Sequence, residues 1–380
     1  MGDLANIVRG ASPRPIQDPK WFDKESNIGW LRISDVTEQN GRIYHLDQHI
    51  SKLGQEKTRV LTEPHLLLSI AATVGKPLVN YIKTGVHDGF LIFLDPLFER
   101  EFMFQWLEMF RPQWKKYGQP GSQVNLNSEL IRNQDILIPG NTEQQKIGSF
   151  FKQLDNLITQ NERKIDLLKQ LKQAYLQKIF SQELRFTGFN DGWEERDLSA
   201  ISDKVTEKNK ENQFSETFTN SAEYGIIDQR DFFDKDISNE KNLNGYYIVH
   251  ENDFVYNPRI SNYAPVGPIK RNKLGRTGVM SPLYYVFRSR GVDKKYLEYY
   301  FDTTAWHIFL KMNGDSGARS DRFAIKDSVF NQMPIPYPTI GEQEQIGSFF
   351  EKLDKAIALH QQKLDLLKKQ KQAYLQKLFI

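Results

Sequence analysis

The sequence predicts an α+β protein in which two pseudo-repeated α/β domains are separated by two long helices that form an antiparallel coiled coil. Three observations lead to this prediction. The chain repeats itself at about half its length, two 38-residue segments carry a heptad pattern, and the remainder shows short β-branched and aromatic runs broken by Gly, Pro and Asn. A chain of 380 residues is long enough for two or three domains, each with its own core.

The domain order follows from the position of the repeated segments. Residues 143–180 align without a gap with residues 342–379, and 23 of the 38 positions are identical. Weaker matches join residues 72–75 to 264–267 and residues 133–134 to 331–332. We therefore interpret the chain as a tandem duplication. The expected domains are globular at 1–142, helical at 143–184, globular at 185–341 and helical at 342–380.

Both repeated segments lack Pro and carry apolar residues at heptad spacing, which is typical of paired helices. The first seam consists of Ile147, Phe151, Leu154, Ile158, Asn161, Ile165, Leu168, Lys172, Tyr175 and Ile179. The second consists of Ile346, Phe350, Leu353, Ile357, His360, Leu364, Leu367, Lys371, Tyr374 and Leu378. Each helix would be about 57 Å long, and the apolar stripe needs a partner. Antiparallel pairing is favoured because it separates the two globular domains, although the long connection permits either direction.

Polar residues interrupt both seams at matching positions. Asn161 corresponds to His360, and Lys172 corresponds to Lys371. Polar seam residues typically fix the register of a helix pair. A metal-binding or proton-transfer role for His360 is the alternative, but its counterpart is Asn and no second His lies one turn away.

The globular parts carry strand and helix patterns in alternation. We expect strands at residues 89–95, 131–139, 245–250 and 282–288. Two aromatic-rich segments, residues 96–110 and 294–311, are expected to be helices.

Known catalytic patterns are missing from the sequence. No cysteine is present, so disulfides, thiolate metal sites and cysteine nucleophiles are excluded. The patterns GxxxxGK[ST], GxGxxG, HExxH and GxSxG do not occur, and Asn257-Pro258 is followed by Arg259 rather than by a second proline. His45 and His49 form an i, i+4 pair without helical periodicity around it, so a metal site there is not favoured.

The composition says little more about the partners or the function of the protein. The formal net charge of +3 does not by itself indicate a partner. The N-terminus has no apolar segment of signal-peptide length, and the longest apolar runs are too short to span a bilayer. We therefore expect a cytoplasmic protein without membrane contact.

The repeated helix pattern IGSFF…LDLLK…KQAYLQK, each time after a variable globular region, resembles the specificity subunit of Type I restriction-modification systems. The resemblance extends over nearly the whole chain and includes AATVGKP, APVGPIK, and the endings ILIP and MPIPYP before EQQ or EQE. One departure is visible. The first repeat begins at GDLANIVRG and lacks a counterpart of LRFTGFNDGWEER, so a trimmed N-terminus is one possibility.

The resemblance implies a non-catalytic DNA-binding subunit. Residues 1–142 and 185–341 would be target recognition domains, each reading one half of a bipartite double-stranded site. Two modification subunits with S-adenosylmethionine would methylate adenine, and restriction subunits with ATP and Mg²⁺ would translocate and cleave DNA. No cofactor is expected on this chain. The repeated Gln173, Gln372, Gln177 and Gln376 are candidate docking positions for the modification subunits.

Candidate DNA contacts lie in loops that combine basic, amide and hydroxyl side chains. Such side chains can form hydrogen bonds with phosphates and base edges. They are Arg9, Ser12, Arg14, Lys83, Gln123 and Asn125 in the first domain, and Arg259, Asn262, Tyr263, Arg271, Arg319 and Arg322 in the second. Two other functions remain open: a coiled-coil adaptor that binds only proteins, and a hydrolase with an unrecognised serine or carboxylate site.

Overall fold

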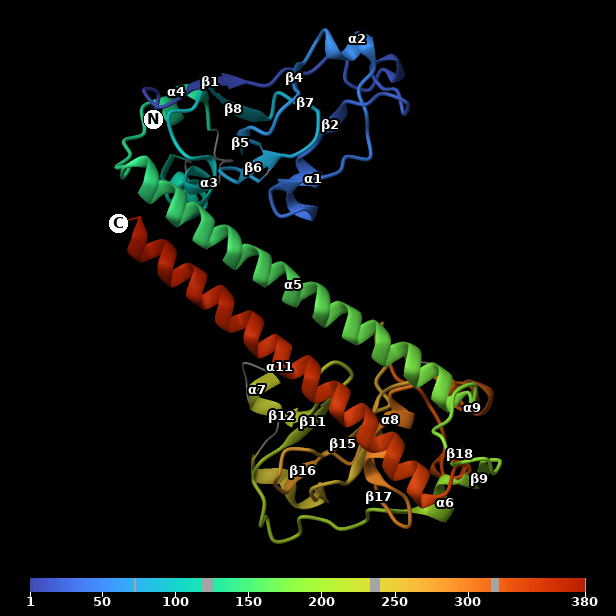
Figure 1. Cartoon of the computed structure of the whole chain (residues 1–380). Coiled ribbons are helices and arrows are strands. Elements are labelled where there is room, and N and C mark those ends of the chain that lie inside the picture. The colour runs from blue at the N-terminus through green and yellow to red at the C-terminus, as the bar shows by residue number, and fades with distance from the viewer. Residues whose placement is uncertain (72, 118–125, 233–239, 316–320, 380) are drawn as a thin grey trace. The chain divides into compact units, whose positions relative to one another are not determined.

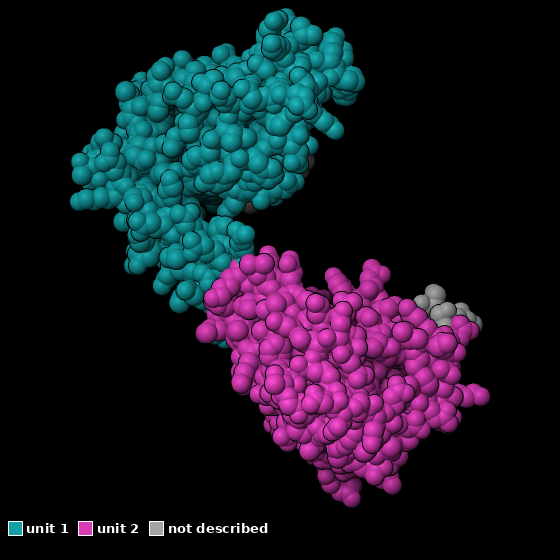
Figure 2. Space-filling model, turned by 45° about the vertical axis from the view of Figure 1, so that its right-hand side comes forward, with its two compact units in different colours: residues 1–163, 361–380 teal, residues 164–360 magenta. Residues whose placement is uncertain are grey.

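The computed structural model describes residues 1–71, 73–117, 126–232, 240–315 and 321–379. They form two compact units, coloured in Figure 2. Unit 1 consists of Met1–Arg163 and Gln361–Ile380, and unit 2 consists of Lys164–His360. Each long helix therefore contributes one part to each unit.

Unit 1 is organised around a five-stranded sheet with the order β1-β8-β5-β6-β3 (Figure 1). Its strands are β1 Asn6–Arg9, β3 Arg42–Ile43, β5 Leu66–Ser69, β6 Pro77–Asn80 and β8 Phe90–Leu94. The pairs are antiparallel except for β3 with β6. A second sheet has the order β2-β7-β4, with β2 Gly29–Leu31, β4 Arg59–Leu61 and β7 Thr84–Val86.

Both faces of the five-stranded sheet are covered, which explains the continuous apolar run of β8. Leu91 and Phe93 point to a cluster that includes Phe104 of α3 (Arg100–Phe110). Phe90 and Ile92 point to the opposite cluster. The remaining helices of unit 1 are η1 Pro19–Trp21, α1 Ile33–Glu38, α2 Lys52–Gln55, η2 Arg111–Tyr117 and α4 Ser128–Arg132.

Unit 2 repeats this architecture. Its four-stranded sheet has the order β10-β17-β14-β15, which corresponds to β1-β8-β5-β6 of unit 1. The strands are β10 Ser202–Lys204, β14 Phe254–Tyr256, β15 Ile269–Arg271 and β17 Tyr285–Ser289. Helix α8 Lys294–Phe301 takes the place of α3. Its Tyr296, Tyr299 and Tyr300 are buried in the largest aromatic cluster of the unit.

Smaller elements complete unit 2. The two-stranded sheets are β11 Phe218–Ser221 with β12 Gly225–Asp228, β13 Tyr247–Val249 with β16 Gly278–Met280, and β9 Glu194–Asp197 with β18 Pro334–Tyr337. The helices are α6 Leu198–Ile201, α7 Gln229–Phe232, η3 Glu240–Gly245, α9 Ala305–Asn313 and α10 Asp327–Phe330.

The repeated segments form the long helices α5 Asn141–Phe180 and α11 Ile340–Leu378, which run side by side in opposite directions (Figure 1). In unit 1, Phe150 near the start of α5 contacts Tyr374 near the end of α11, with ring centroids 5.2 Å apart. In unit 2, Tyr175 and Phe349 make the same contact at 5.2 Å. These contacts confirm the antiparallel coiled coil. The matching strand orders of the two units confirm the predicted α+β repeat.

A glutamine fixes each long helix to the domain before it. In unit 1, Gln144 accepts a hydrogen bond from the Glu99 N–H (2.9 Å) and donates to the Pro139 carbonyl (2.8 Å). Gln343 does the same in unit 2, with Asp293 N (2.9 Å) and the Pro338 carbonyl (2.8 Å). Glu99 and Asp293 are the N-caps of α3 and α8, so the duplicated glutamine joins two helix starts.

Two predicted elements were wrong. Residues 131–139 do not form a strand, because residues 128–132 belong to α4 and the following residues have no strand partner among the described residues. In the second repeat the matching strand β18 pairs with β9. Residues 294–311 form two helices rather than one, because α8 ends at its C-cap Asp302.

Candidate nucleic-acid interface

Two loops of unit 2 pair to form an exposed basic edge. The Ile260 N–H donates to the Asp321 carbonyl (2.9 Å), and the Phe323 N–H donates to the Pro258 carbonyl (2.7 Å). This short antiparallel pairing sets Arg259 opposite Arg322. Both arginines are exposed, and neither forms an ion pair with a described residue. Their charges are therefore available for a ligand.

A hollow of about 680 Å³ lies against this edge. Arg259, Tyr263 and Arg322 line it together with Asn220, Ser261 and Tyr284. The ring of Tyr263 is 80% exposed at the rim, and the neighbouring Asn262 is exposed as well. Two cations and an exposed aromatic ring beside a hollow can contact a phosphate and a base together.

Buried amides hold the loop in place. Asn257 donates from its side chain to the Asn220 carbonyl (2.8 Å) and accepts from the Arg259 N–H (3.0 Å). Asn220, only 2% exposed, donates to the carbonyls of Val255 (2.7 Å) and Pro268 (3.2 Å). Gly267 has a φ of 82°, and a Cβ there would lie 2.0 Å from the Asn257 carbonyl oxygen. The loop is therefore held at its base while its tip is exposed.

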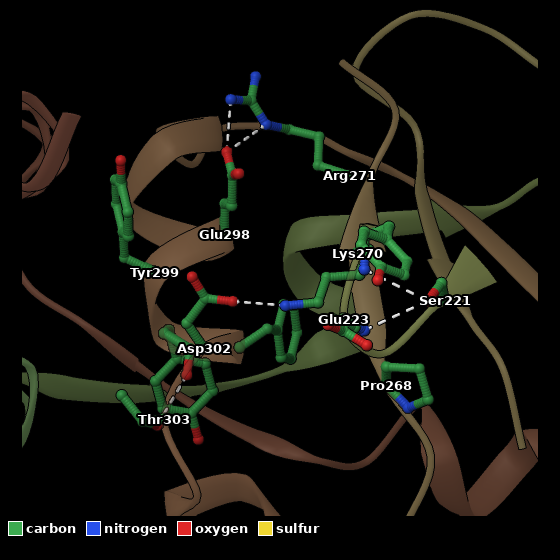
Figure 3. A network of polar contacts seen from close by, with 12 residues as sticks. Ser221, Glu223, Pro268, Lys270, Arg271, Glu298, Tyr299, Asp302 and Thr303 are labelled. Atoms are coloured by element: carbon green, nitrogen blue, oxygen red, sulfur yellow. Dashed lines mark hydrogen bonds and ion pairs between the residues drawn. The ribbon is translucent and has the colours of Figure 1, made fainter. Parts of the chain in front are cut away.

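Arg271, another predicted DNA contact, is engaged within the domain. Its side chain is 12% exposed and donates to Glu298 at 2.8 and 2.5 Å (Figure 3). It also donates to Asn252 at 2.6 Å. Lys273 reaches the same carboxylate at 2.5 Å, and Lys270 pairs with Asp302 at 2.7 Å. Acidic residues of the same domain thus neutralise Lys270, Arg271 and Lys273, so Arg271 is not available to DNA in this arrangement.

In unit 1, three predicted contacts meet at one residue, Asp88, two of them at its carboxylate and one at its backbone carbonyl. Ser12 Oγ donates to Asp88 Oδ1 (2.9 Å), Arg14 Nη2 donates to Asp88 Oδ2 (2.9 Å), and Arg9 Nε donates to the Asp88 carbonyl (2.6 Å). Partial burial acts to raise the pKa of Asp88, but the Ser12 hydrogen bond and the nearby positive charges lower it overall. Arg14 stays 80% exposed, so it can still reach a phosphate.

A hollow of about 600 Å³ lies beside this cluster. Its polar lining includes residues that the sequence did not single out: Gln17, Arg32, Ser34, Gln48 and His87. Burial lowers the pKa of His87, and its Nδ1 accepts a hydrogen bond from the Gly89 N–H (2.9 Å), so the ring is neutral at pH 7. The Arg32 guanidinium is held by Asp35 at 2.8 Å. The glutamines become candidates only because the fold brings them together in the lining of this hollow.

For the other predicted DNA contacts and docking positions, the structure shows exposure or no described placement. Lys83 is exposed, and no contact of its side chain with a described residue joins it to the Asp88 cluster. Gln123, Asn125 and Arg319 lie outside the described residues. The four candidate docking glutamines, Gln173, Gln177, Gln372 and Gln376, are all exposed on the long helices.

The described part of the chain contains no group of three or more His, Asp or Glu residues arranged to hold a metal ion. Within the same residues, no helix combines the length and apolar character needed to cross a bilayer.

Comparison with known proteins agrees with this arrangement. A sequence profile of the Type I restriction modification DNA specificity domain matches residues 1–170 and 190–369. The S subunit of a Type-I restriction-modification system from M. genitalium has a TM-score of 0.61 at 12% identity, covering 100% of this chain and 94% of that one. A chain from a structural study of complex assembly and conformational transition of the type I R-M system has a TM-score of 0.53 at 16% identity, covering 100% and 96%. The chain therefore belongs to the Type I restriction-modification DNA specificity family and carries two of its domains in tandem.

Proposed function

We propose that this chain reads a two-part site in double-stranded DNA, one half with each recognition domain, and that it performs no catalysis itself. The observation that carries the proposal is the doubled specificity domain, each copy with an exposed basic cluster of its own. In unit 1 the cluster is Arg9, Ser12 and Arg14, and in unit 2 it is Arg259, Tyr263 and Arg322.

The two clusters suit different kinds of DNA contact, one with base edges and the other with phosphates. Arginine can form two hydrogen bonds with a guanine edge in the major groove, while Ser and Arg also bind phosphates. Arg259 and Arg322 are not paired with described acidic residues, which favours them for base contacts. Arg14 shares Asp88 with Ser12, which favours a phosphate contact that fixes the orientation of the loop.

We further propose that methylation and cleavage reside on other subunits. Two modification subunits with S-adenosylmethionine would methylate adenine, and restriction subunits would use ATP and Mg²⁺. The exposed Gln173, Gln177, Gln372 and Gln376 are the proposed docking positions for the modification subunits. Because its target is genomic DNA, we propose that the complex acts in the cytoplasm.

The test is a domain exchange in cells that express this chain with its modification subunits. Residues 185–341 are replaced by the corresponding domain of a family member with another target, and methylated adenines are mapped across the genome. We expect one half of the methylated site to change while the other half stays the same. The proposal is wrong if both halves stay unchanged or if no methylation depends on this chain.

Two other functions would give different results with the same purified chain and its complex. A protein-binding adaptor would assemble with partners but confer no DNA affinity on the complex. A hydrolase would turn over a substrate as the purified chain alone. The exposed arginines beside a hollow favour DNA binding over both.

A further inference from the structure

The hollow of unit 1 lies at the turn that joins β7 to β8. His87 directly follows β7 and lines the hollow together with Trp30 and Gln48. The first strand begins at the other end of β8, where Asn6 lies opposite Leu94. The hollow is therefore at the opposite end of β8 from the first residues of β1.

Unit 2 has its hollow at the equivalent turn. The turn between β16 and β17 contributes Ser281, Leu283 and Tyr284 to the lining of the hollow of about 680 Å³. In the order of its sheet, β17 takes the place of β8, and β16 precedes it in the chain as β7 precedes β8. The side chains differ, because residues 87–89 read His-Asp-Gly and residues 281–284 read Ser-Pro-Leu-Tyr. A hollow at the same turn with different side chains fits two domains that read different half-sites.

The proton of the His87 ring has a fixed position. Its Nδ1 accepts a hydrogen bond from the Gly89 N–H (2.9 Å). The Asp88 carboxylate lies 3.1 Å from the same nitrogen and favours a protonated ring, but burial has the larger effect and lowers the pKa of His87 overall. A neutral ring with Nδ1 as acceptor carries its proton on Nε2. This Nε2–H donor has no hydrogen-bond partner among the described residues.

Packing holds this donor in place. The imidazole ring of His87 meets the Trp30 ring edge to face, with centroids 5.8 Å apart. Trp30 is buried and packs on its other contact against Phe22, with centroids 6.4 Å apart. The His87 side chain still keeps part of its surface exposed. A donor that is fixed by packing and partly exposed loses little freedom when it binds a ligand.

Gln48 supplies a second polar group in the same lining. Its backbone carbonyl accepts a hydrogen bond from the Trp30 N–H (2.7 Å), which holds the main chain beside the hollow. Gln48 is half-buried, and its side chain forms no hydrogen bond with a described residue. The amide offers one acceptor and a donor group, the pattern that matches N6 and N7 of adenine in the major groove.

The basic cluster of unit 1 is connected to this hollow. Asp88 directly follows His87 and binds Ser12 and Arg14 through its carboxylate. Ile16, two residues after Arg14, lines the hollow. A phosphate bound at Arg14 would therefore bring the neighbouring base edges to the hollow, because phosphate contacts set the orientation of a protein on the duplex.

From these observations we propose that His87 and Gln48 determine the base specificity of unit 1 in the major groove. His87 donates from Nε2 to an acceptor on a base edge, and Gln48 reads an adenine at another position. Guanine, adenine and thymine each present an acceptor in the major groove, whereas cytosine presents only its N4 amino donor. His87 therefore excludes cytosine at one position of its half-site. This assignment rests on the proposed function, because it presupposes that unit 1 reads DNA.

The test uses the full chain in complex with its modification subunits, and duplexes that carry each single-base change of the mapped methylation site. His87→Asn keeps an acceptor for the Gly89 N–H at the place of Nδ1 but removes the Nε2 donor. It should lose about three- to tenfold of the discrimination against cytosine at one position. Gln48→Ala should relax another position, where the parent selects adenine, by about the same factor. The half-site read by residues 185–341 should not change.

Two further variants serve as controls. His65→Asn makes the same chemical change at the other end of the sheet, beside Leu66, which lies opposite Phe93, and should alter neither position. His87→Gln keeps an N–H donor near the place of Nε2, so it should discriminate against cytosine better than His87→Asn. Unchanged discrimination, or an equal loss for every DNA sequence, would overturn the assignment of the residue replaced. A parent complex without site-specific binding would instead contradict the proposed function.

Discussion

Lys371 of α11 lies 2.6 Å from the Asp155 carboxylate of α5, and its counterpart Lys172 lies 2.6 Å from Asp354. The two pairs are related by the same offset of 199 residues. Lysines that interrupt the apolar seam are therefore matched by acids on the opposite helix. In unit 1 the carboxylate also accepts a hydrogen bond from Gln105 (2.7 Å), which joins the helix pair to α3.

Asp155→Ala should destabilise unit 1 by about 3 kcal/mol, because it leaves the half-buried Lys371 without its counterion and removes the acceptor for Gln105. Glu162→Ala is the matched control, since Glu162 pairs with Lys368 where both side chains are more than 40% exposed. It should cost less than about 1 kcal/mol. Calorimetric unfolding of both variants measures the difference. Equal losses would mean that the Asp155 pair has no special structural role.

Gly148→Ala should weaken the attachment of α5 to α3. A Cβ at residue 148 would lie 2.4 Å from Glu99 Oε2 and 2.8 Å from the Phe102 nitrogen, the two atoms of the α3 capping bond. At the counterpart Gly347, the nearest atom is Asp293 Oδ1 at 2.8 Å. We expect a loss of about 2 kcal/mol for Gly148→Ala and less for Gly347→Ala.

The control for this prediction is Ser149→Ala, one residue further along α5 and exposed. Alanine is the better helix former, so its free energy of unfolding should stay the same or rise slightly. Denaturant unfolding monitored by circular dichroism compares the three variants. A Gly148→Ala protein as stable as Ser149→Ala would show that the two helices can separate without cost.

Arg322→Ala and Arg271→Ala should separate DNA binding from folding. Arg322 is exposed and forms no ion pair with a described residue, so its replacement should leave stability unchanged. If it reads a guanine, the assembled complex should lose about 1–3 kcal/mol of DNA affinity, with relaxed specificity at one base. Arg271→Ala should instead cost about 2 kcal/mol of stability, since it breaks the buried Glu298 pair.

Unfolding experiments and binding titrations on a panel of single-base variants check this prediction. Equal loss of affinity for every DNA sequence after Arg322→Ala would indicate a phosphate contact rather than base readout. Unchanged stability after Arg271→Ala would contradict the structural role of the Glu298 pair.

The repeat and the long helices could be predicted from the sequence, because 23 identities and a heptad period can be recognised without knowing any distant partner. The prediction failed for residues 131–139, because a strand forms only when another strand pairs with it, and these residues have no strand partner among the described residues, whereas β18 pairs with β9. It also placed Arg271 among the DNA contacts, because its acidic partner Glu298 lies more than 20 residues away in the chain.

The same limitation applies to unit 1. Arg9, Ser12 and Arg14 could be proposed from residue type, but Asp88, which gathers them, is 74 residues or more distant in sequence. Gln17 and Gln48 became candidates only when the hollow beside His87 was known. Loop chemistry can be predicted from sequence, whereas the partners of each loop residue depend on the fold.

His307 should make unit 2 less stable as the pH falls below neutrality. Burial, with a smaller contribution from Lys311, lowers its pKa from 6.5 to about 4, and the ring packs against Trp306 with centroids 4.3 Å apart. The unfolded chain therefore binds a proton on His307 before the folded one does. The stabilisation is complete above pH 6.5 and is lost as the pH falls toward 4.

His307→Gln should remove up to about 1.4 kcal/mol per pH unit from the slope of unfolding free energy between pH 6 and 5, and less where solvent screens the ring. Lys311→Met should make the total loss smaller, because removing a neighbouring positive charge raises the folded-state pKa of His307 toward its unfolded value. Identical slopes for the parent chain and His307→Gln would show that this histidine is protonated equally well in both states.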